Sequence, residues 1–233
     1  MIEFHAARVA VPDADPEIRS ERELLAPTTL ALGERRVAII GSNGSGKSTL
    51  ARLINGLITP TSGTVTVNGL DVARNGAKVR RQVGFCFTDP SAQMVMPTCV
   101  EDVELSLRRT HKDKRERRTA ALDVLERYGL RERADQSVHT LSGGQRQMLA
   151  LAGVLATDPA IVVADEPTTL LDLRNSRIVG DTLMGLDQQL ILVTHDLDLA
   201  ARCDRALVVE GARVVFDGPA PAAIEAYVGA VGR

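Results

Sequence analysis

A glycine-rich segment between an apolar run and a helical segment constrains this chain more than any other feature. The apolar run is residues 37–40 (VAII), and residues 50–54 (LARLI) continue with helical periodicity. The pattern G-x-x-x-x-G-K-[ST] between a strand and a helix is typical of loops that bind nucleotide phosphates. Glycines let the main chain approach phosphate oxygens, and N–H groups at the helix start point at the anion. The candidate ATP-binding residues of this loop are Gly41, Ser42, Asn43, Gly44, Ser45, Gly46, Lys47, Ser48 and Thr49.

Two residues of the loop have specific expected roles. Lys47 would reach the β- and γ-phosphates, and the Ser48 hydroxyl would ligate Mg²⁺. An ordinary glycine-rich turn is the alternative, and the strand before the loop and the helix after it argue against that alternative. The sequence therefore predicts a nucleotide-binding loop.

Two carboxylates follow a second apolar run, residues 161–164 (IVVA). They are Asp165 and Glu166, with Pro167 next. Because parallel strands end at one edge of a sheet, both carboxylates should lie beside the phosphate loop. Asp165 then suits the Mg²⁺ shell, through water, and Glu166 is the candidate to polarise the attacking water. Taken alone, this motif is also compatible with a solvated acidic turn.

A histidine ends a third apolar run, residues 190–193 (LILV). A single histidine is more often structural than catalytic, but His195 stands at the tip of a further strand of the same expected sheet. We therefore expect it at the catalytic centre, in contact with the γ-phosphate.

The segment Ser142, Gly143, Gly144, Gln145 precedes an apolar helix. Ser142 and Gln145 have the spacing of a capping box, which is a purely structural explanation. The two glycines, however, leave the backbone bare where an anion could approach. With Leu141, the segment matches the signature sequence of ABC-type ATPases at every position.

Strands and helices alternate on both sides of a helical block. This alternation predicts an α/β fold with a largely parallel sheet covered on both faces, plus a strand at residues 2–11 at the edge of a sheet. We expect one domain over 1–233, with a nucleotide-binding core at 1–89 and 151–233 and an inserted helical subdomain at 90–150.

Composition and charge exclude several classes. The chain has a net charge of −2, six aromatic residues and no Trp, which argues against a nucleic-acid partner. Three scattered cysteines indicate a reducing compartment. No stretch reaches 18 consecutive apolar residues, so we expect a cytosolic protein or a peripheral one on the cytoplasmic face of a membrane.

In their order along the chain, these motifs resemble those of the nucleotide-binding subunit of ABC transporters. The resemblance implies a P-loop NTPase (RecA-like) core with an N-terminal antiparallel β part, and it implies ATP and Mg²⁺ as ligands. It also implies a head-to-tail dimer, in which each ATP lies between the phosphate loop of one subunit and residues 142–145 of the other. Leu171 and Asp172 match the loop that touches the opposite site.

A second segment narrows the resemblance. Residues 89–93 (DPSAQ), then Pro97 and Thr98, then Asp102 and Val103, are similar to the ATPase component of energy-coupling factor vitamin importers. Residues 168–174 (TTLLDLR) fit the biotin-type branch best and the cobalt or nickel branch second. The family pairs its ATPases with a transmembrane scaffold protein and a small substrate-capture membrane protein.

The sequence departs from this family at two positions. Thr88 stands where this family usually has a glutamine in the loop. Gln93 would then serve only the contact with the membrane partner. The aromatic residue that stacks on adenine aligns near Val11, so adenine would rest on aliphatic surface.

The sequence is also compatible with other functions. Residues 94–96 (MVM) suit either docking of a scaffold helix or core packing. The alternatives to a biotin importer are a cobalt, nickel or conventional ABC transporter, or a non-transport ABC ATPase that acts on nucleic acid or as a soluble assembly scaffold.

Overall fold

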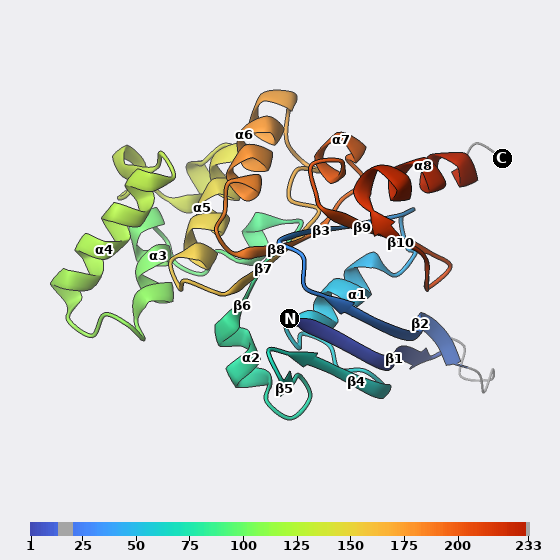
Figure 1. The fold of residues 1–233 in the computed structure, drawn as a ribbon. Helices are drawn as coiled ribbons and strands as arrows, with labels where there is room; N and C mark the ends of the chain where they lie inside the picture. Colours follow the sequence, from blue (N-terminus) through green and yellow to red (C-terminus); the bar gives the residue numbers. More distant parts are fainter. Residues whose placement is uncertain (14–20, 232–233) are drawn as a thin grey trace.

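The computed structural model describes residues 1–13 and 21–231, which form two sheets with helices between and around them (Figure 1). The first sheet has the strand order β2-β1-β4-β5 and is antiparallel. The second has the order β10-β9-β3-β8-β7-β6, and its strands are parallel except for β10. The strands are β1 (Ile2–Pro12), β2 (Glu21–Leu32), β3 (Arg36–Ile40), β4 (Ser62–Val67), β5 (Leu70–Asp71), β6 (Val83–Cys86), β7 (Ile161–Asp165), β8 (Gln189–Val193), β9 (Arg205–Glu210) and β10 (Arg213–Pro219).

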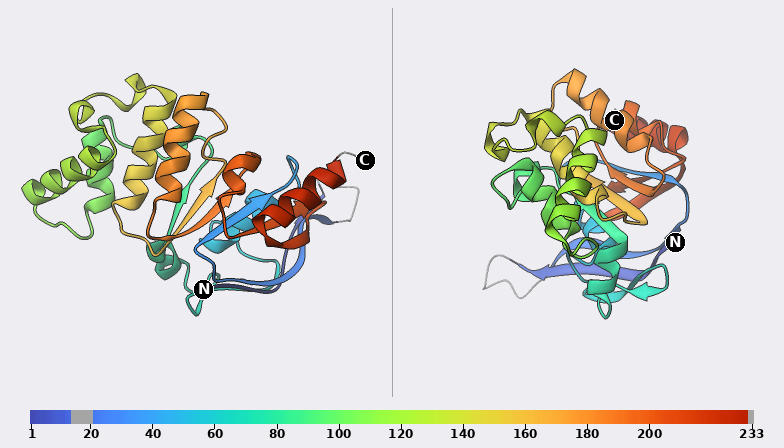
Figure 2. Two further views of the ribbon diagram at one scale, coloured as in Figure 1. Left: turned by 45° about the horizontal axis from the view of Figure 1, so that its top comes forward. Right: turned by 90° about the vertical axis from the view of Figure 1, so that its left-hand side faces the viewer.

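The helices lie on three sides of the six-stranded sheet. Helix α1 lies between the two sheets, α6 to α8 cover the opposite face of the larger sheet, and α3 and α4 project beyond β6 (Figures 1 and 2). The bounds are α1 (Lys47–Ile54), α2 (Gly76–Gln82), α3 (Cys99–Leu107), α4 (Lys114–Arg127), α5 (Gly143–Leu155), α6 (Leu173–Met184), α7 (Leu197–Ala200) and α8 (Ala220–Val231). Short 3₁₀ turns occupy Pro90–Ala92, Arg131–Arg133 and Val138–Thr140.

Three apolar clusters stabilise this arrangement. One fills the space between the sheets around α1, a second joins the larger sheet to α5 to α8, and a third holds α3, α4 and α5 together. Strands β3, β7 and β8 contribute alternate residues to the first two clusters, because side chains along a strand point to opposite faces. This double burial explains why these three strands read as continuous apolar runs.

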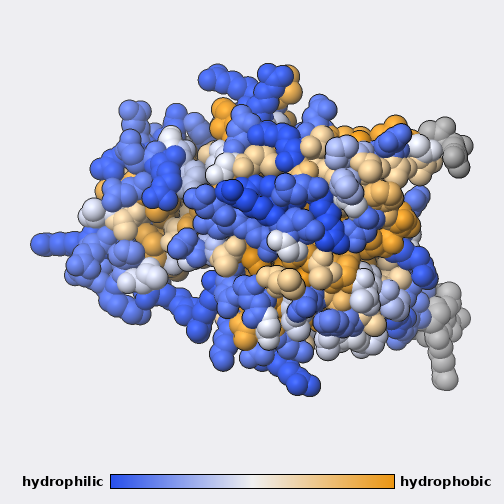
Figure 3. Space-filling view, in the orientation of Figure 1, coloured by the Kyte–Doolittle hydropathy of each residue, from blue (hydrophilic) through white to orange (hydrophobic). Residues whose placement is uncertain are grey.

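Helix α5 links the helical block to the core. Leu149 belongs to the cluster with α3 and α4, whereas Leu151 packs with the larger sheet. The expected boundary at residue 150 falls inside this helix, and the division into core and helical subdomain remains a prediction. Hydrophilic side chains cover the end of the molecule formed by α3 and α4 (Figure 3).

The prediction that residues 2–11 form an edge strand is wrong. Strand β1 lies inside its sheet, because β2 pairs with one side of it and β4 with the other: Ile2 pairs with Leu32 and also with Val67. Alternation of side chains shows that a segment is a strand, but not how many neighbours it has.

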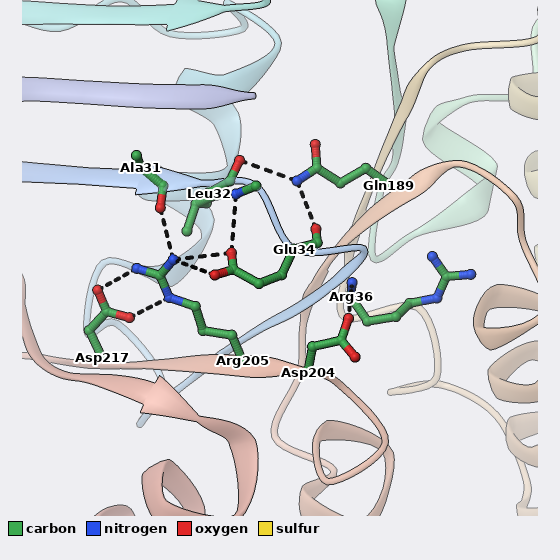
Figure 4. Close-up of polar contacts among 9 residues, drawn as sticks. Ala31, Leu32, Glu34, Arg36, Gln189, Asp204, Arg205 and Asp217 are labelled. Atoms are coloured by element: carbon green, nitrogen blue, oxygen red, sulfur yellow. Dashed lines mark hydrogen bonds and ion pairs between the residues drawn. The ribbon is translucent and has the colours of Figure 1, made fainter.

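A polar cluster between the end of β2 and the strands β8, β9 and β10 ties the two sheets together (Figure 4). The guanidinium group of Arg205 on β9 donates to both oxygens of Asp217 on β10, at 2.6 and 2.7 Å, and to Glu34, at 3.0 Å. It also donates to the carbonyl oxygen of Ala31 at the end of β2. The amide of Gln189 on β8 donates to the carbonyl oxygens of Leu32 and Glu34.

Candidate functional site

The predicted site residues of the core follow adjacent strands of the larger sheet. The loop 41–46 follows β3, His195 comes two residues after β8, and Asp165 and Glu166 end β7 and follow it. Since β3, β8 and β7 are neighbours and parallel, these groups meet at one edge of the sheet. The structure therefore brings together the loop, both carboxylates and the histidine.

The phosphate loop has the backbone that its glycines were expected to provide. Gly41, Gly44 and Gly46 have φ angles of 144°, 78° and 109°. A Cβ at Gly41 would lie 2.0 Å from the carbonyl oxygen of Val209, and one at Gly46 would lie 2.8 Å from that of Leu24. The loop therefore requires glycine at both positions for space as well as for conformation.

Two polar groups of the loop point to an anionic ligand. The Ser45 hydroxyl oxygen is buried and has no hydrogen-bond partner among the described residues. Lys47 is also buried, and its ammonium group donates to the carbonyl oxygens of Gly41 and Ser42, both at 2.8 Å. Burial lowers the pKa of Lys47, and the nearby charges of Glu166 and Asp165 oppose that shift. An orphaned hydroxyl, a buried cation and the helix N-terminus of α1 together fit a phosphate chain.

Ser48 and Asp165 form a pair of oxygen ligands. The Ser48 hydroxyl donates to Oδ1 of Asp165 at 2.9 Å, and an Nη atom of Arg52 lies 3.7 Å from Oδ2. Burial raises the pKa of Asp165, whereas Ser48 and Arg52 act against that shift. Mg²⁺ prefers hydroxyl, carboxylate, phosphate and water oxygens, so this pair fits the ion expected beside a bound triphosphate. Among residues 1–13 and 21–231, no group of three or more His, Cys, Asp or Glu side chains is placed to hold a metal ion, so phosphate and water would supply the remaining ligands.

Glu166 is held in one orientation by its neighbours. Its φ angle is 53°, a left-handed conformation uncommon outside glycine, and its N–H donates to the carbonyl oxygen of Val193. Its Oε2 atom lies 2.7 Å from Nδ1 of His195 and 3.0 Å from the hydroxyl of Thr169. Thr169 was not among the predicted site residues, because its role depends on where the Glu166 side chain points. A backbone held away from its preferred conformation is common where a catalytic group must be aimed.

A cavity of about 450 Å³ lies beside the phosphate loop and Glu166. It is lined by Arg22, Glu23, Leu24, Asn43, Gly44, Gly46, Lys47, Ser48, Thr49 and Glu166. Its size is within the range of small-ligand sites. Residues 22–24 of β2 were not among the predicted site residues.

The signature segment lies outside this cavity. Ser142 is exposed and caps α5: its hydroxyl accepts from the N–H of Gln145, whose side chain accepts from the N–H of Ser142. Gly144 is packed so closely on α6 that a Cβ there would lie 2.4 Å from the side chain of Asn175. Neither Ser142 nor Gln145 lines the cavity around Lys47.

Thr88 and Gln93 have different surroundings. The Thr88 hydroxyl donates to the carbonyl oxygen of Asp165 at 2.9 Å, next to the two carboxylates. The Gln93 amide accepts from the N–H of Phe87 and donates to the carbonyl oxygen of Phe85. Gln93 therefore braces the end of β6, whereas Thr88 contacts the end of β7.

Comparison with known proteins agrees with this geometry. The family model described as "ABC transporter" matches residues 28–169, more than half of the chain. The chain belongs to this family. Its members are ATPases, so the protein is an ATP-binding and ATP-hydrolysing subunit of an ABC transporter, and its fold is that of a P-loop NTPase.

Individual members of the ABC transporter family resemble the chain over most of its length. A "Putative ABC transporter ATP-binding protein" of Deinococcus radiodurans is 47% identical, over 89% of this chain and 92% of that protein. The "Biotin transport ATP-binding protein BioM" of Rhizobium etli is 45% identical, over 88% and 92%. The "Energy-coupling factor transporter ATP-binding protein EcfA1" of Bacillus subtilis is 37% identical, over 86% and 73%.

A solved structure of an ABC cassette has the same fold. The dimeric structure of a post-hydrolysis state of the ATP-binding cassette MJ0796, bound to ADP and Pi, has a TM-score of 0.84 and 29% identity. The match covers 94% of this chain and 99% of that one. None of the helices formed by residues 1–13 and 21–231 has the length and apolar character needed to cross a membrane.

Proposed function

We propose that this subunit energises an importer of the energy-coupling factor type, with biotin as its transported substrate. The convergence of Lys47, Ser48, Asp165, Glu166 and His195 at one sheet edge carries the ATPase part of the proposal. The similarity to a biotin transport protein and to an energy-coupling factor protein supports the importer part. The motif at residues 168–174 favours the biotin branch over the cobalt or nickel branch.

In this proposal the triphosphate lies along residues 41–49, and Lys47 neutralises its β- and γ-phosphates. Ser48 and Asp165, the latter through water, would hold Mg²⁺, which supplies charge neutralisation to the phosphates when bound. Glu166 polarises the attacking water, and His195 contacts the γ-phosphate. Both side chains are already oriented, because they are hydrogen-bonded to each other.

Hydrolysis would require two copies of the chain. Ser142, Gly143, Gly144 and Gln145 lie outside the cavity that contains Lys47, so they can complete only the site of a partner copy. The resemblance to a dimeric cassette supports a head-to-tail homodimer. In this arrangement Leu171 and Asp172 reach the opposite site, and ATP binding closes the pair.

We place the membrane partners at a groove beside β6. The groove is lined by residues from α2, β6, α3 and α5, together with Gln93. The neighbouring residue Val95 is 71% exposed, whereas Met94 packs against the α3, α4 and α5 cluster. Docking of a transmembrane scaffold protein here therefore depends on Val95 more than on Met94. The subunit would then sit peripherally on the cytoplasmic face, with a substrate-capture membrane protein in the same complex.

Isolation of the native complex tests the proposal. We expect the chain to co-purify with a scaffold protein and a small capture protein, and cells that carry the complex to take up labelled biotin. Lys47→Ala should abolish uptake without loss of assembly, and Val95→Asp should weaken assembly without loss of ATP binding. A complex built only on conventional permease subunits, or hydrolysis stimulated by DNA, would contradict the importer assignment.

A further inference from the structure

The nucleotide cavity has an end that the phosphate chemistry does not use. Residues 43–49 and Glu166 account for the lining next to the triphosphate. The remaining lining residues are Arg22, Glu23 and Leu24, all on β2. When the phosphates of a nucleotide lie on the loop, its nucleoside would lie next to these three residues. No aromatic side chain of the described residues lines the cavity.

The backbone fixes this part of β2 against the phosphate loop. Ala212, in the turn between β9 and β10, donates its N–H to the carbonyl oxygen of Ser45 at 2.9 Å and accepts from the N–H of Ala26 at 2.7 Å. The carbonyl oxygen of Leu24 lies against Gly46, where a Cβ would come within 2.8 Å of it. Arg22 and Leu24 therefore have a defined position relative to the bound phosphates.

Arg22 is a cation without a partner in the part of the chain that the structure describes. Its two acidic neighbours on β2 are engaged elsewhere: Glu21 and Glu23 each lie 3.0 Å from the guanidinium group of Arg8. Glu23 also lies 3.7 Å from an Nη atom of Arg213. Arg22 is thus an exposed lining residue of the cavity, and it forms no ion pair with a carboxylate of residues 1–13 or 21–231.

The surroundings of Arg22 favour a flat, apolar-faced ligand over a second anion site. Its cross-strand partner is Val11, near which the family's adenine-stacking aromatic residue aligns. Directly paired residues of an antiparallel sheet lie on the same face, so the aliphatic side chain of Val11 and the side chain of Arg22 leave the same face of this sheet. Leu24 lines the same cavity. A planar guanidinium beside aliphatic side chains can stack on the face of an aromatic ring.

We propose that Arg22 holds the base of the bound nucleotide by stacking its guanidinium plane on the ring. The inference rests on the proposed placement of ATP in this cavity and assigns the base-binding residue of that site. Because every base presents a π-face, such a contact discriminates weakly between adenine and guanine. Lysine would not replace it, because an ammonium group has no plane to stack.

Binding measurements on the full chain separate the base from the phosphates. The affinities for ATP, GTP and inorganic tripolyphosphate are measured by calorimetry for the wild type and for Arg22→Ala, Arg22→Lys and Arg22→Tyr. We expect Arg22→Ala to lower the affinities for ATP and GTP by about fivefold and to leave the affinity for tripolyphosphate unchanged. Arg22→Tyr should restore ATP affinity, and Arg22→Lys should not. Arg74→Ala, an exposed arginine outside the cavity, is the charge-matched control and should bind like the wild type.

Three results would overturn the inference. An Arg22→Ala protein that binds ATP normally shows that Arg22 does not contact the nucleotide. If Arg22→Ala loses equal affinity for ATP and for tripolyphosphate, and Arg22→Lys restores the affinity whereas Arg22→Tyr does not, then Arg22 is a phosphate ligand. A loss equal to that of Arg74→Ala shows only a long-range charge effect. Lys47→Ala distinguishes a failure of the proposed site from a failure of the role proposed for Arg22. If this variant binds neither ATP nor tripolyphosphate, the proposed phosphate site stands even where the role of Arg22 is refuted. If it binds both normally, the site itself is misplaced.

Discussion

The Nδ1 atom of His195 lies 2.7 Å from Oε2 of Glu166. The two residues follow neighbouring parallel strands, β8 and β7, so the sheet itself sets their separation. The same carboxylate oxygen also receives the hydroxyl of Thr169 at 3.0 Å, and no hydrogen bond from a described residue reaches Oε1. One oxygen of the carboxylate is thus used to fix its orientation, and the other remains to accept a proton from water.

Glu166→Gln should separate ATP binding from ATP hydrolysis. The amide has nearly the same shape as the carboxylate but cannot take a proton from the attacking water, so we expect turnover to fall by at least about 100-fold. ATP affinity should stay close to that of the wild type, and ATP should hold the variant as a dimer. Steady-state hydrolysis, nucleotide binding and size-exclusion chromatography with ATP measure the three effects. Normal hydrolysis would refute the assignment of Glu166.

Thr169→Val should slow hydrolysis without weakening nucleotide binding. Valine keeps the shape of threonine but removes the donor to Oε2 of Glu166, and a hydrogen bond to a charged group is worth about 1.5–3 kcal/mol. Because His195 still holds the carboxylate, we expect the low end of that range, a kcat about tenfold lower with KM unchanged. Thr169→Ser keeps the hydroxyl and should restore kcat. Equal activity of the valine and serine variants would show that the contact does not aim the carboxylate.

The two glycines of the signature segment should respond differently to a methyl group. A Cβ at Gly143 would lie no closer than 3.8 Å to any neighbour, whereas one at Gly144 would lie 2.4 Å from Cγ and Oδ1 of Asn175. Asp172 restrains that side chain through its bond to the Asn175 amide, at 2.8 Å. We expect Gly144→Ala to lower the melting temperature and Gly143→Ala to keep or raise it, because alanine favours a helix. Thermal unfolding without nucleotide measures both, and equal melting temperatures would contradict the close packing of α5 on α6.

The sequence located the core site residues because each follows an apolar strand directly. Residues 37–40, 161–164 and 190–193 are buried on both faces, so their composition alone marks them as parallel strands. The loop, Asp165, Glu166 and His195 then had to meet at one sheet edge. The order of the motifs along the chain and the parallel direction of the strands were sufficient to predict this meeting point.

Contacts between segments far apart in sequence were not predictable in the same way. The polar start of β2, from Glu21, is stabilised by pairing with β1 and by the contact of Glu21 with Arg8. The position of Arg22 at the cavity follows from that pairing. Helix α2 went unpredicted, since it is short and starts with a glycine.

Arg205 should stabilise the fold more than an exposed arginine does. Its side chain is 19% exposed and bonds to Asp217 and Glu34, whereas Arg202 is 44% exposed and bonds to one carboxylate, Asp181. We expect Arg205→Ala to cost about 2 kcal/mol at pH 7, since it leaves two carboxylates without their shared donor. Arg202→Ala should cost under about 0.5 kcal/mol. Urea unfolding of both variants makes the comparison, and equal losses would mean that the cluster does not hold the sheets together.

The contribution of Glu34 to this cluster should disappear in acid. Burial acts to raise the pKa of Glu34, but the hydrogen bonds from its own N–H and from Arg205 outweigh it, so the pKa is lower than that of an ordinary glutamate. A carboxylate with a lowered pKa in the folded state adds stability above its unfolded pKa, about 4.3, and loses it as the pH falls through the folded value. Glu34→Gln should therefore be less stable than the wild type at pH 7, and the difference should shrink below about pH 4. Unfolding free energies at pH 7, 5 and 3 test this, and a gap that stays constant or widens toward pH 3 would show that the ion pair with Arg205 is not its source.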